Sequence, residues 1–492
     1  MFDKRKLAAV LVLAIVGSFA VASGLSVPQP AMSLTAATAP DRSVSPVARQ
    51  LQQTMDRMRF RQVLDLAPAR SAQNRPLEPS ADKEATTPEQ RVRMYAAISN
   101  PRPIVQQPQL NATVLELDSR GRITSSGTVL MSPQYSHGIV VPVDRDFHTN
   151  DVRWRQWDDS GWYTNRGKGT IDVVTGRAHA PLDFMLPYPA SVLKLMVNFG
   201  VLRLADTGQI KLGDTYNYRP TLASSLCGRA SSNTIRGYID ASLTWSSNAA
   251  SCALIKLLWD HNAIGSLNQT FQDLGLETLQ LKGTAPANGG NWSNAITMSS
   301  LDTAKLLALI NGSPGRLWTA PDGKAVTSAV LSLSARRLFK QELGQQGWNW
   351  MLSTTNYCGS HYPGPGIPQR VAKRWIAADG TVKVHGSNFS QDVRHCNATA
   401  QVAFAHKPGW VSNAGADAGI VQSLPGTAHR HYIIAVFSNL GDQYQDPNRP
   451  PTSTGVVPVE YTQKFAQLGL AIDNFEARCS TNPGFRGGCR LI

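Results

Sequence analysis

The stretch PYPASVLKLMVNFGVLRLADTG, which runs from Pro187 to Gly208, contains a serine three residues ahead of a lysine. Its apolar residues recur at helical spacing, prolines precede the helix where a first turn tolerates them, and Asp-Thr-Gly marks its end. Residues three apart lie on one face of a helix, so Ser191 and Lys194 can meet without help from the rest of the fold. The stretch predicts a buried helix that begins near Ala190 with this pair in its first turn.

The Ser191–Lys194 pair has two interpretations. In the catalytic one, the helix dipole and the free amides of the first turn stabilise a developing oxyanion, and burial lowers the pKa of Lys194 so that it acts as a base. In the structural one, Ser191 caps the helix and Lys194 extends its ammonium group to solvent. The spacing alone does not choose between them, because SADK at residues 80–83 repeats it in a proline-rich segment.

A second serine motif favours the catalytic interpretation. In TWSSNAASCALIKLL, Ser246 and Asn248 stand at the start of an Ala-rich helical pattern. A hydroxyl there can relay a proton to a leaving group, and an amide can orient an acyl side chain. The same Ser-Ser-Asn sequence occurs at residues 231–233, and we prefer the later copy because an Ala-rich helix that we expect to be buried follows it directly.

A lysine motif near the C-terminal end of the chain points the same way. VAFAHKPGWVSNAGADAGIV alternates like a strand up to Lys407 and then leads into a glycine-rich turn. A lysine on an edge strand can hold a substrate carboxylate, and Gly409 would let the substrate backbone approach closely.

In the order Ser-x-x-Lys, Ser-x-Asn, Lys-x-Gly, these motifs resemble those of the penicillin-recognising serine hydrolases, nearest to class A β-lactamases and low-molecular-mass penicillin-binding proteins. NAITMSSLDTAKLLALI is similar to the segment after the omega loop of class A enzymes. The resemblance covers about Asp146 to Cys479 and implies a β-lactamase/transpeptidase-like fold with an antiparallel sheet packed against a helical block. The succession of strands, a helical block, strands and a closing helix independently predicts an α+β arrangement.

The resemblance also implies a role for each motif residue. The implied set is the nucleophile Ser191, its general base Lys194, the proton shuttle Ser246, and the substrate-binding residues Asn248, Lys407, Gly409 and Trp410. Two backbone amides, those of Ser191 and Trp410, would form the oxyanion hole. No metal or organic cofactor is implied.

The chain departs from the class A pattern at two points. Residues 279–294, which correspond to the omega loop, contain no Asp or Glu, and Glu277 lies ahead of them. Class A enzymes activate the deacylating water with a glutamate in that loop, so deacylation here needs Lys194, another base or a different acceptor. Pro408 replaces the usual threonine or serine and removes a hydroxyl that helps to bind the substrate carboxylate.

The six cysteines favour an oxidising compartment. They allow 15 pairings, of which nearest-neighbour pairing is the simplest. It joins Cys227 to Cys252, Cys358 to Cys396, and Cys479 to Cys489. The second of these would staple an irregular insertion around residues 357–397, in which His361 and His395 are expected to be loop residues and not ligands.

The N-terminal 109 residues divide into two predicted segments. Residues 1–22 have basic residues, an apolar run and a small-residue end, as a secretory signal peptide does, with an uncleaved membrane anchor as the alternative. Residues 23–109, rich in Pro, Ala, Ser and Gln, predict a partly disordered linker with a short amphipathic helix at about residues 50–66. The hydrolase domain is then expected at residues 110–478, and a tail with a disulfide loop at residues 479–492.

We therefore predict a secreted or cell-envelope serine hydrolase, monomeric, that forms an acyl-enzyme at Ser191 with a β-lactam or a related amide or ester. The alternatives are a D-alanyl-D-alanine peptidase or esterase, and a wall-associated binding protein with little turnover. Forty-eight Lys and Arg against 34 Asp and Glu give a net charge of +14, which favours anionic partners such as wall polymers. The basic residues are scattered and accompany no nucleic-acid-binding motif, so we expect a small-molecule or peptidyl acyl substrate and no nucleic acid.

Overall fold

The computed structural model describes most of the chain between residues 44 and 481. The described residues are 44–65, 102–104, 108–158, 169–220, 224, 226–358, 365–411, 413–441, 444–445 and 461–481. The predicted signal peptide, most of the predicted linker, and Cys489 lie outside them.

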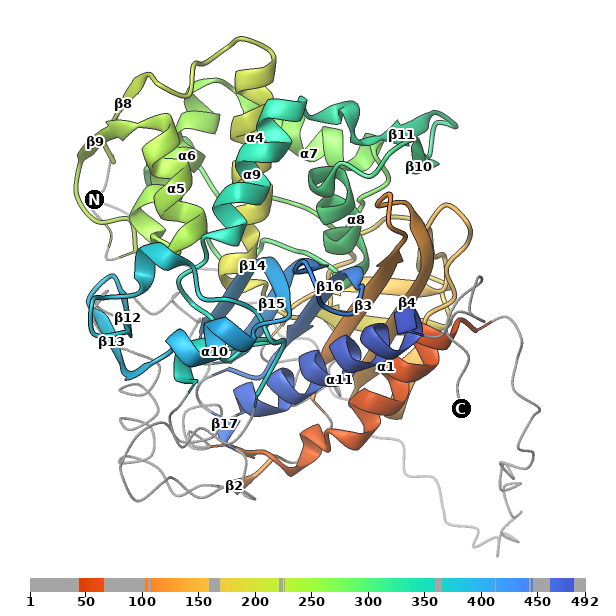
Figure 1. The fold of residues 1–492 in the computed structure, drawn as a ribbon. Coiled ribbons are helices and arrows are strands. Elements are labelled where there is room, and N and C mark those ends of the chain that lie inside the picture. The colour runs from red at the N-terminus through yellow and green to blue at the C-terminus, as the bar shows by residue number, and fades with distance from the viewer. Residues whose placement is uncertain are drawn as a thin grey trace, which may run out of the picture. The chain divides into compact units, whose positions relative to one another are not determined.

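A six-stranded antiparallel sheet forms the middle of the domain (Figure 1). Its strands follow the order β14-β15-β16-β3-β4-β5, so strands from the two ends of the domain pair at the centre of the sheet. The bounds are β3 Leu110–Leu117, β4 Ile123–Ser132, β5 Tyr135–Val140, β14 Val402–Val411, β15 Ala414–Ser423 and β16 His431–Ser438. All eight residues of β16 are buried, as expected for a strand whose sheet is covered on both faces.

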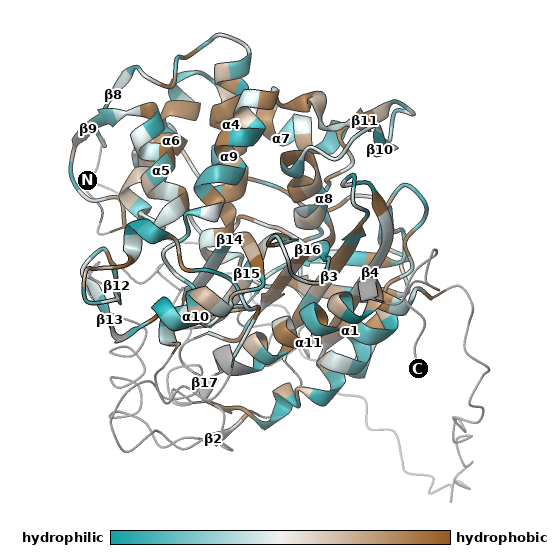
Figure 2. Cartoon of the chain, in the orientation of Figure 1, coloured by the Kyte–Doolittle hydropathy of each residue, from teal (hydrophilic) through white to brown (hydrophobic). Residues whose placement is uncertain are grey.

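A helical block covers one face of the sheet and confirms the predicted α+β fold. It begins with the short 3-10 helix η2 and continues through six α-helices. They are η2 Ala190–Leu193, α4 Lys194–Asp206, α5 Ile235–Thr244, α6 Asn248–Asp260, α7 Ala263–Asp273, α8 Ser300–Asn311 and α9 Leu333–Gly344. Much of α4 and α8 is apolar, as their brown colour in Figure 2 shows, and both contribute to one hydrophobic core with the inner face of the sheet.

Small elements complete the described structure. Strands β6 (Val152–Gln156) and β7 (Leu182–Leu186) pair in parallel, and β7 leads into η2. Other short strands are β1 Leu64–Asp65, β2 Arg102–Pro103, β8 Thr215–Tyr218, β9 Ser231–Thr234, β10 Arg316–Thr319, β11 Ala325–Thr327 and β17 Tyr444–Gln445. Other short 3-10 helices are η1 Phe60–Gln62, η3 Pro286–Asn288 and η4 Ser328–Val330.

Two helices, α1 (Pro46–Arg57) and α11 (Tyr461–Thr481), cover the other face of the sheet. The Ser45 hydroxyl accepts from the Ala48 amide and donates to the Ser126 carbonyl of β4 at 2.6 Å, which fixes the start of α1 on the sheet. At Gly127, an added Cβ would stand 2.5 Å from the backbone of Ala48, so glycine permits this close approach.

These two helices correct the predicted domain bounds. The sequence assigns α1 to the linker, but its apolar face is buried in the same core as α11, so the domain includes residues well before 110. The predicted amphipathic helix is present, but it begins four residues and ends nine residues earlier than expected. At the other end, α11 continues to Thr481, so Cys479 belongs to a helix that packs on this core and not to a tail.

Leu51→Ala tests whether α1 is part of the domain. Leu51 is fully buried, so its truncation is expected to lower the free energy of unfolding by about 2–5 kcal/mol. Urea denaturation measures the change, with the exposed neighbour Gln53→Ala as the control. Equal stability of Leu51→Ala and Gln53→Ala would mean that α1 does not stabilise the domain.

The predicted irregular insertion contains regular structure. Its elements are η5 Thr355–Tyr357, η6 Lys373–Trp375, β12 Thr381–Val384, β13 Ser387–Asp392 and α10 Arg394–Thr399. The β12–β13 hairpin turns at His385 and Gly386, which both have positive φ, as a two-residue type I′ turn requires. A His-Gly pair after the alternating sequence TVKV was the available signal for this hairpin.

Candidate active site

Ser191 lies in η2, at the junction between β7 and α4. The helix predicted from Ala190 is present, but its first turn is a 3-10 turn and the α-helix begins at Lys194. Ala190 has φ +45°, in the left-handed region that non-glycine residues rarely adopt. Such backbone strain is often found at functional sites, and here it immediately precedes the predicted nucleophile.

The Lys194 amine is fully buried among four oxygen atoms. Its Nζ lies 2.8 Å from Ser191 Oγ and 3.0 Å from Ser246 Oγ, and donates to the Ser246 carbonyl and to Asn248 Oδ1, both at 2.8 Å. Burial, reinforced by the nearby charge of Lys407, holds the pKa of Lys194 well below its usual value. The buried position of the amine excludes the structural interpretation, in which Lys194 extends its ammonium group to solvent.

Ser246 and Asn248 reach Lys194 from the turn between α5 and α6. Ser246 has φ +67°, and Ser247 caps α6 by accepting from the Ala250 amide at 3.1 Å. The competing Ser-Ser-Asn sequence at residues 231–233 forms the exposed strand β9, so it is not part of this cluster. The competing SADK at residues 80–83 lies outside the described residues.

Lys407 enters the cluster from the edge strand β14. Its Nζ donates to Ser246 Oγ at 2.9 Å, so the Ser246 hydroxyl lies between two amines. Burial lowers the pKa of Lys407 to about 7, an effect that the negative charge of Asp417 opposes. The structure thus brings Ser191, Lys194, Ser246, Asn248 and Lys407 together, although they come from three separate segments.

Gly409 lies against the backbone of the nucleophile turn, a contact that the sequence did not predict. A Cβ added there would stand 2.5 Å from the amide nitrogen of Ser191 and 2.9 Å from that of Val192. The missing side chain therefore lets β14 approach the backbone of the nucleophile turn, whereas we expected it to admit a substrate backbone. Trp410 follows directly, with its ring edge-on to Trp350 at a centroid distance of 3.9 Å.

Pro408 is compatible with this strand because β14 is the edge of the sheet. Proline cannot donate to a neighbouring strand and is found mainly in edge strands. Its carbonyl oxygen accepts from Lys407 Nζ at 2.9 Å, so this residue helps to hold the lysine even without a hydroxyl.

Residues 279–294 fold into a loop that packs on α6 and on the segment before Ser191. Trp292 Nε1 donates to the Tyr188 hydroxyl at 2.8 Å, and the Gly289 carbonyl accepts from Tyr218 at 2.6 Å. Glu277, ahead of the loop, pairs with Arg177 at 3.1 Å.

A buried polar network behind Lys407 was not predicted. His406 Nδ1 lies 2.8 Å from Asp417 Oδ1, and His406 Nε2 lies 2.9 Å from Asn349 Oδ1. Asn349 is oriented by donating to Asn356 Oδ1, and Asn356 by donating to the Gly347 carbonyl. Gln369 Nε2 also lies 3.3 Å from His406 Nε2, so Asp417, Asn349 and Gln369 together hold the orientation of this buried imidazole.

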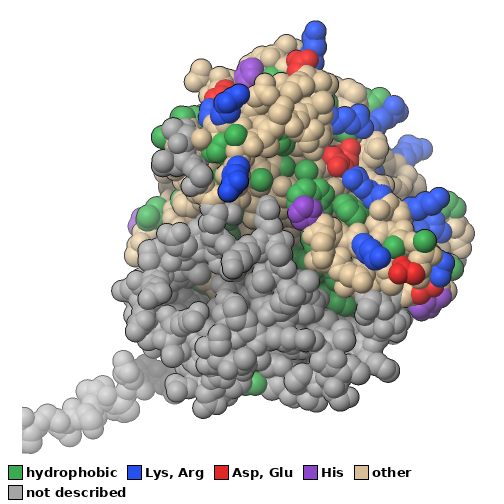
Figure 3. All heavy atoms as spheres, turned by 90° about the vertical axis from the view of Figure 1, so that its left-hand side faces the viewer, with side chains coloured by type: hydrophobic (Ala, Val, Ile, Leu, Met, Phe, Trp, Pro, Cys, Tyr) green, Lys and Arg blue, Asp and Glu red, His purple; other side chains and the backbone are tan. Residues whose placement is uncertain are grey.

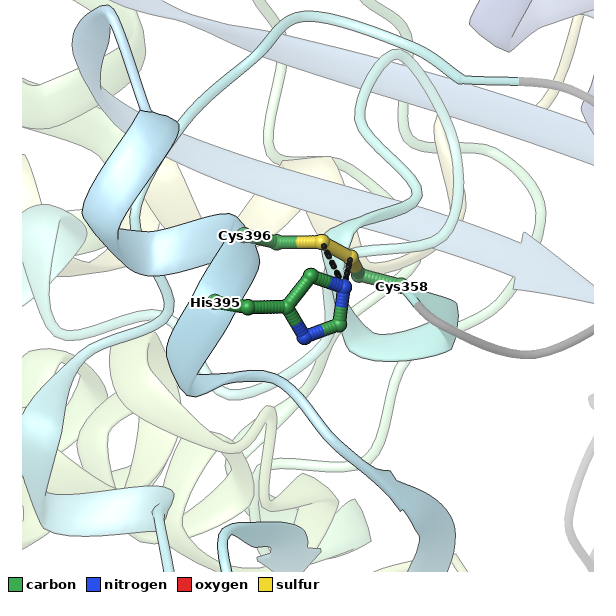
Figure 4. Close-up of side chains that lie close together, drawn as sticks. All are labelled: Cys358, His395 and Cys396. Carbon is green, nitrogen blue, oxygen red and sulfur yellow. Dashed lines mark hydrogen bonds between the residues drawn. A yellow bond between two sulfur atoms is a disulfide. The ribbon is translucent and has the colours of Figure 1, made fainter.

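The predicted disulfides Cys227–Cys252 and Cys358–Cys396 are both present. Beside the second, His395 Nε2 lies 3.2 Å from Cys396 Sγ and 3.6 Å from Cys358 Sγ (Figure 4). Metal ions bind thiolates, and a disulfide offers none, so this trio is a disulfide with a neighbouring histidine. His395 lies in α10 and not in a loop as predicted, and His361 lies outside the described residues. The third predicted pair involves Cys489, outside the described residues.

The surface adds little to the assignment. On the described part of the face shown in Figure 3, Lys and Arg side chains are interspersed with uncharged ones. Within the described part of the chain, no helix combines the length and the apolar character that a membrane crossing needs.

One family model matches part of the chain. Residues 186–354 match the model of the beta-lactamase enzyme family. This match fits the resemblance of the sequence motifs to those of the penicillin-recognising serine hydrolases. The matched range contains Ser191, Lys194, Ser246 and Asn248, whereas Lys407 lies after it. None of the curated proteins matches the chain in sequence.

Solved structures similar to the chain include penicillin-binding and β-lactamase proteins. PBP-A is 16% identical, with 81% of this chain and 96% of that chain covered and a TM-score of 0.40. A beta-lactamase from Chitinophaga pinensis is 16% identical, with 58% and 84% covered and a TM-score of 0.36. The TLA-1 extended spectrum beta-lactamase is 13% identical, with 79% and 97% covered and a TM-score of 0.39.

Proposed function

We propose that the protein is an exported serine hydrolase that forms an acyl-enzyme at Ser191. The observation that carries the proposal is the 2.8 Å contact between Ser191 Oγ and the buried amine of Lys194. A nucleophile with a base of lowered pKa within hydrogen-bond distance is the arrangement that acyl transfer requires.

Acylation follows from the contacts around Lys194. In its neutral form the amine has two N–H groups, which the Ser246 carbonyl and Asn248 Oδ1 accept, and a lone pair directed to the hydroxyls. Lys194 then takes the Ser191 proton as Oγ attacks a carbonyl carbon. The backbone amides of Ser191 and Trp410 stabilise the oxyanion. The bond to the leaving group breaks as the Ser246 hydroxyl passes it a proton, which the adjacent amines replace.

The substrate class follows from the same residues. Lys407 supplies positive charge for the carboxylate of a β-lactam or of a related amide or ester, and Asn248 orients the acyl side chain. Because residues 279–294 contain no acid, water reaches the acyl group without a glutamate base, and the acyl-enzyme is expected to be long-lived. A D-alanyl-D-alanine peptidase or an esterase would use the same acylation step.

A labelling experiment tests the proposal. The purified protein is incubated with a fluorescent penicillin and, separately, with an activated serine-hydrolase probe, and Ser191→Ala is the matched control. Labelling of the wild type and loss of labelling in Ser191→Ala are expected. Labelling that survives in Ser191→Ala, or no labelling by either reagent, would contradict the nucleophile assignment.

The two lysines predict a bell-shaped pH dependence of acylation. The rate rises as Lys194 loses its proton, through a pH well below the usual lysine pKa of 10.5. It falls near pH 7 for a carboxylate-bearing substrate, because Lys407 loses the charge that binds the carboxylate. Stopped-flow measurement of the acylation rate across a range of pH gives both the rising and the falling limb of the profile. The profile of Lys407→Gln should lack the falling limb. A wild-type rate that still rises up to pH 10 would contradict this assignment.

A further inference from the structure

Residues 346–348, just after α9, hold the end of helix α5. The last carbonyls of an α-helix have no partner within the helix and need one from outside. Three consecutive carbonyls at the end of α5 accept from this segment. Gln346 Nε2 donates to Leu243 at 2.9 Å, the Gly347 amide to Thr244 at 2.7 Å, and Trp348 Nε1 to Trp245 at 2.7 Å. Ser246 is the next residue of the chain, so the segment fixes the turn that carries it.

Gln346 also contacts β14, the strand that carries Lys407. The same Nε2 donates to the His406 carbonyl of β14 at 3.2 Å, and Gln346 Oε1 accepts from the Trp348 amide at 3.0 Å. The side chain is 3% exposed, so water does not compete for these hydrogen bonds. One buried amide therefore joins the turn before Ser246 to the residue before Lys407.

We propose that Gln346 is a positioning residue for acylation, an inference that rests on the proposed function. It sets the separation between the α5–α6 turn and β14, and thereby the 2.9 Å contact between Ser246 Oγ and Lys407 Nζ. Ser246 has a left-handed backbone conformation, which persists only when its surroundings enforce it. Without the bridge, the Ser246 hydroxyl leaves its place between the two amines, and proton transfer to the leaving group slows.

Crystal structures of the wild type and of Gln346→Met test the geometry without any assay of activity. Methionine has a similar length and removes both hydrogen bonds from Nε2. The distance between Ser246 Oγ and Lys407 Nζ is expected to exceed hydrogen-bonding range in the variant. An unchanged distance would overturn the proposal, whatever the protein's activity.

Acylation by a fluorescent penicillin then measures the consequence. Because misplacement by about 1 Å costs up to about a hundredfold in rate, Gln346→Met is expected to acylate between about ten- and a hundredfold more slowly than the wild type. Gln109→Met is the matched control, since Gln109 is also a buried amide that donates to a carbonyl, that of Met185. Equal rates in Gln346→Met and the wild type would overturn the inference, whereas a wild type without Ser191 labelling would overturn the proposed function.

Gln346→Glu separates positioning from a general loss of stability. A carboxylate there faces two carbonyl oxygens and donates no hydrogen bond, but its protonated form donates one. The rate of Gln346→Glu relative to the wild type is therefore expected to rise as the pH falls, because protonation restores one donated hydrogen bond. The ratio of the two rates is used because the effects of Lys194 and Lys407 cancel in it. A ratio that is independent of pH would contradict the positioning role.

Discussion

Lys194→Met is expected to reduce the rate of acylation of Ser191 by about a thousandfold, the middle of the range for loss of a general base. Methionine fills nearly the same volume but cannot accept the Ser191 proton. The measurement is the second-order rate constant for labelling by a fluorescent penicillin. The rising limb of the pH profile should disappear together with the rate.

The chain provides a matched control for this substitution. Lys305 of α8 is also fully buried, and burial also lowers its pKa, but its amine donates to the carbonyls of Gly275 and Phe147. Lys305→Met should lower stability and leave the acylation rate of the folded protein close to that of the wild type. If Lys194→Met and Lys305→Met lost the same fraction of activity, burial and not base catalysis would explain the role of Lys194.

Gly409→Ala is expected to slow acylation by about a hundredfold, as a displacement of about 1 Å at a reacting group does. The new methyl group meets the amide nitrogens of Ser191 and Val192 at 2.5 and 2.9 Å, and backbone atoms cannot move aside as a flexible side chain does. The nucleophile and the proposed oxyanion hole must therefore move apart.

Gly213→Ala is the control for the glycine substitution, because a Cβ at Gly213 meets nothing within 4 Å. Both variants are compared by labelling rate and by urea denaturation. A Gly409→Ala variant that acylates as fast as the wild type would show that β14 and η2 can separate without loss of function.

The sequence predicted the parts of the site that depend on local patterns. A periodic pattern marks each of three elements: the buried helix with the Ser191–Lys194 pair, the helix after Ser246 and the strand before Lys407. The order of the three motifs along the chain then carried the resemblance to the family and the role of each residue. The SADK repeat shows why spacing alone was insufficient. What distinguished Ser191 was the apolar helix that buries Lys194.

The parts that sequence reasoning missed depend on distances across the fold. Helix α1 has a helical pattern, but nothing local shows that its apolar face lies on the sheet beside α11. Gln346 stands in the sequence GQQGWNW, where no periodicity distinguishes it from Gln345. The contact of Gly409 with the backbone of Ser191 was not predicted, because a glycine signals a close approach without identifying what approaches.

The most direct test of acyl transfer at Ser191 is mass spectrometry of the protein after incubation with benzylpenicillin. Intact-mass measurement should show one acyl adduct, and peptide mapping should place it on Ser191, with none in Ser191→Ala. An adduct on a different residue, or an unmodified Ser191 in a protein that still turns over the substrate, would contradict the account.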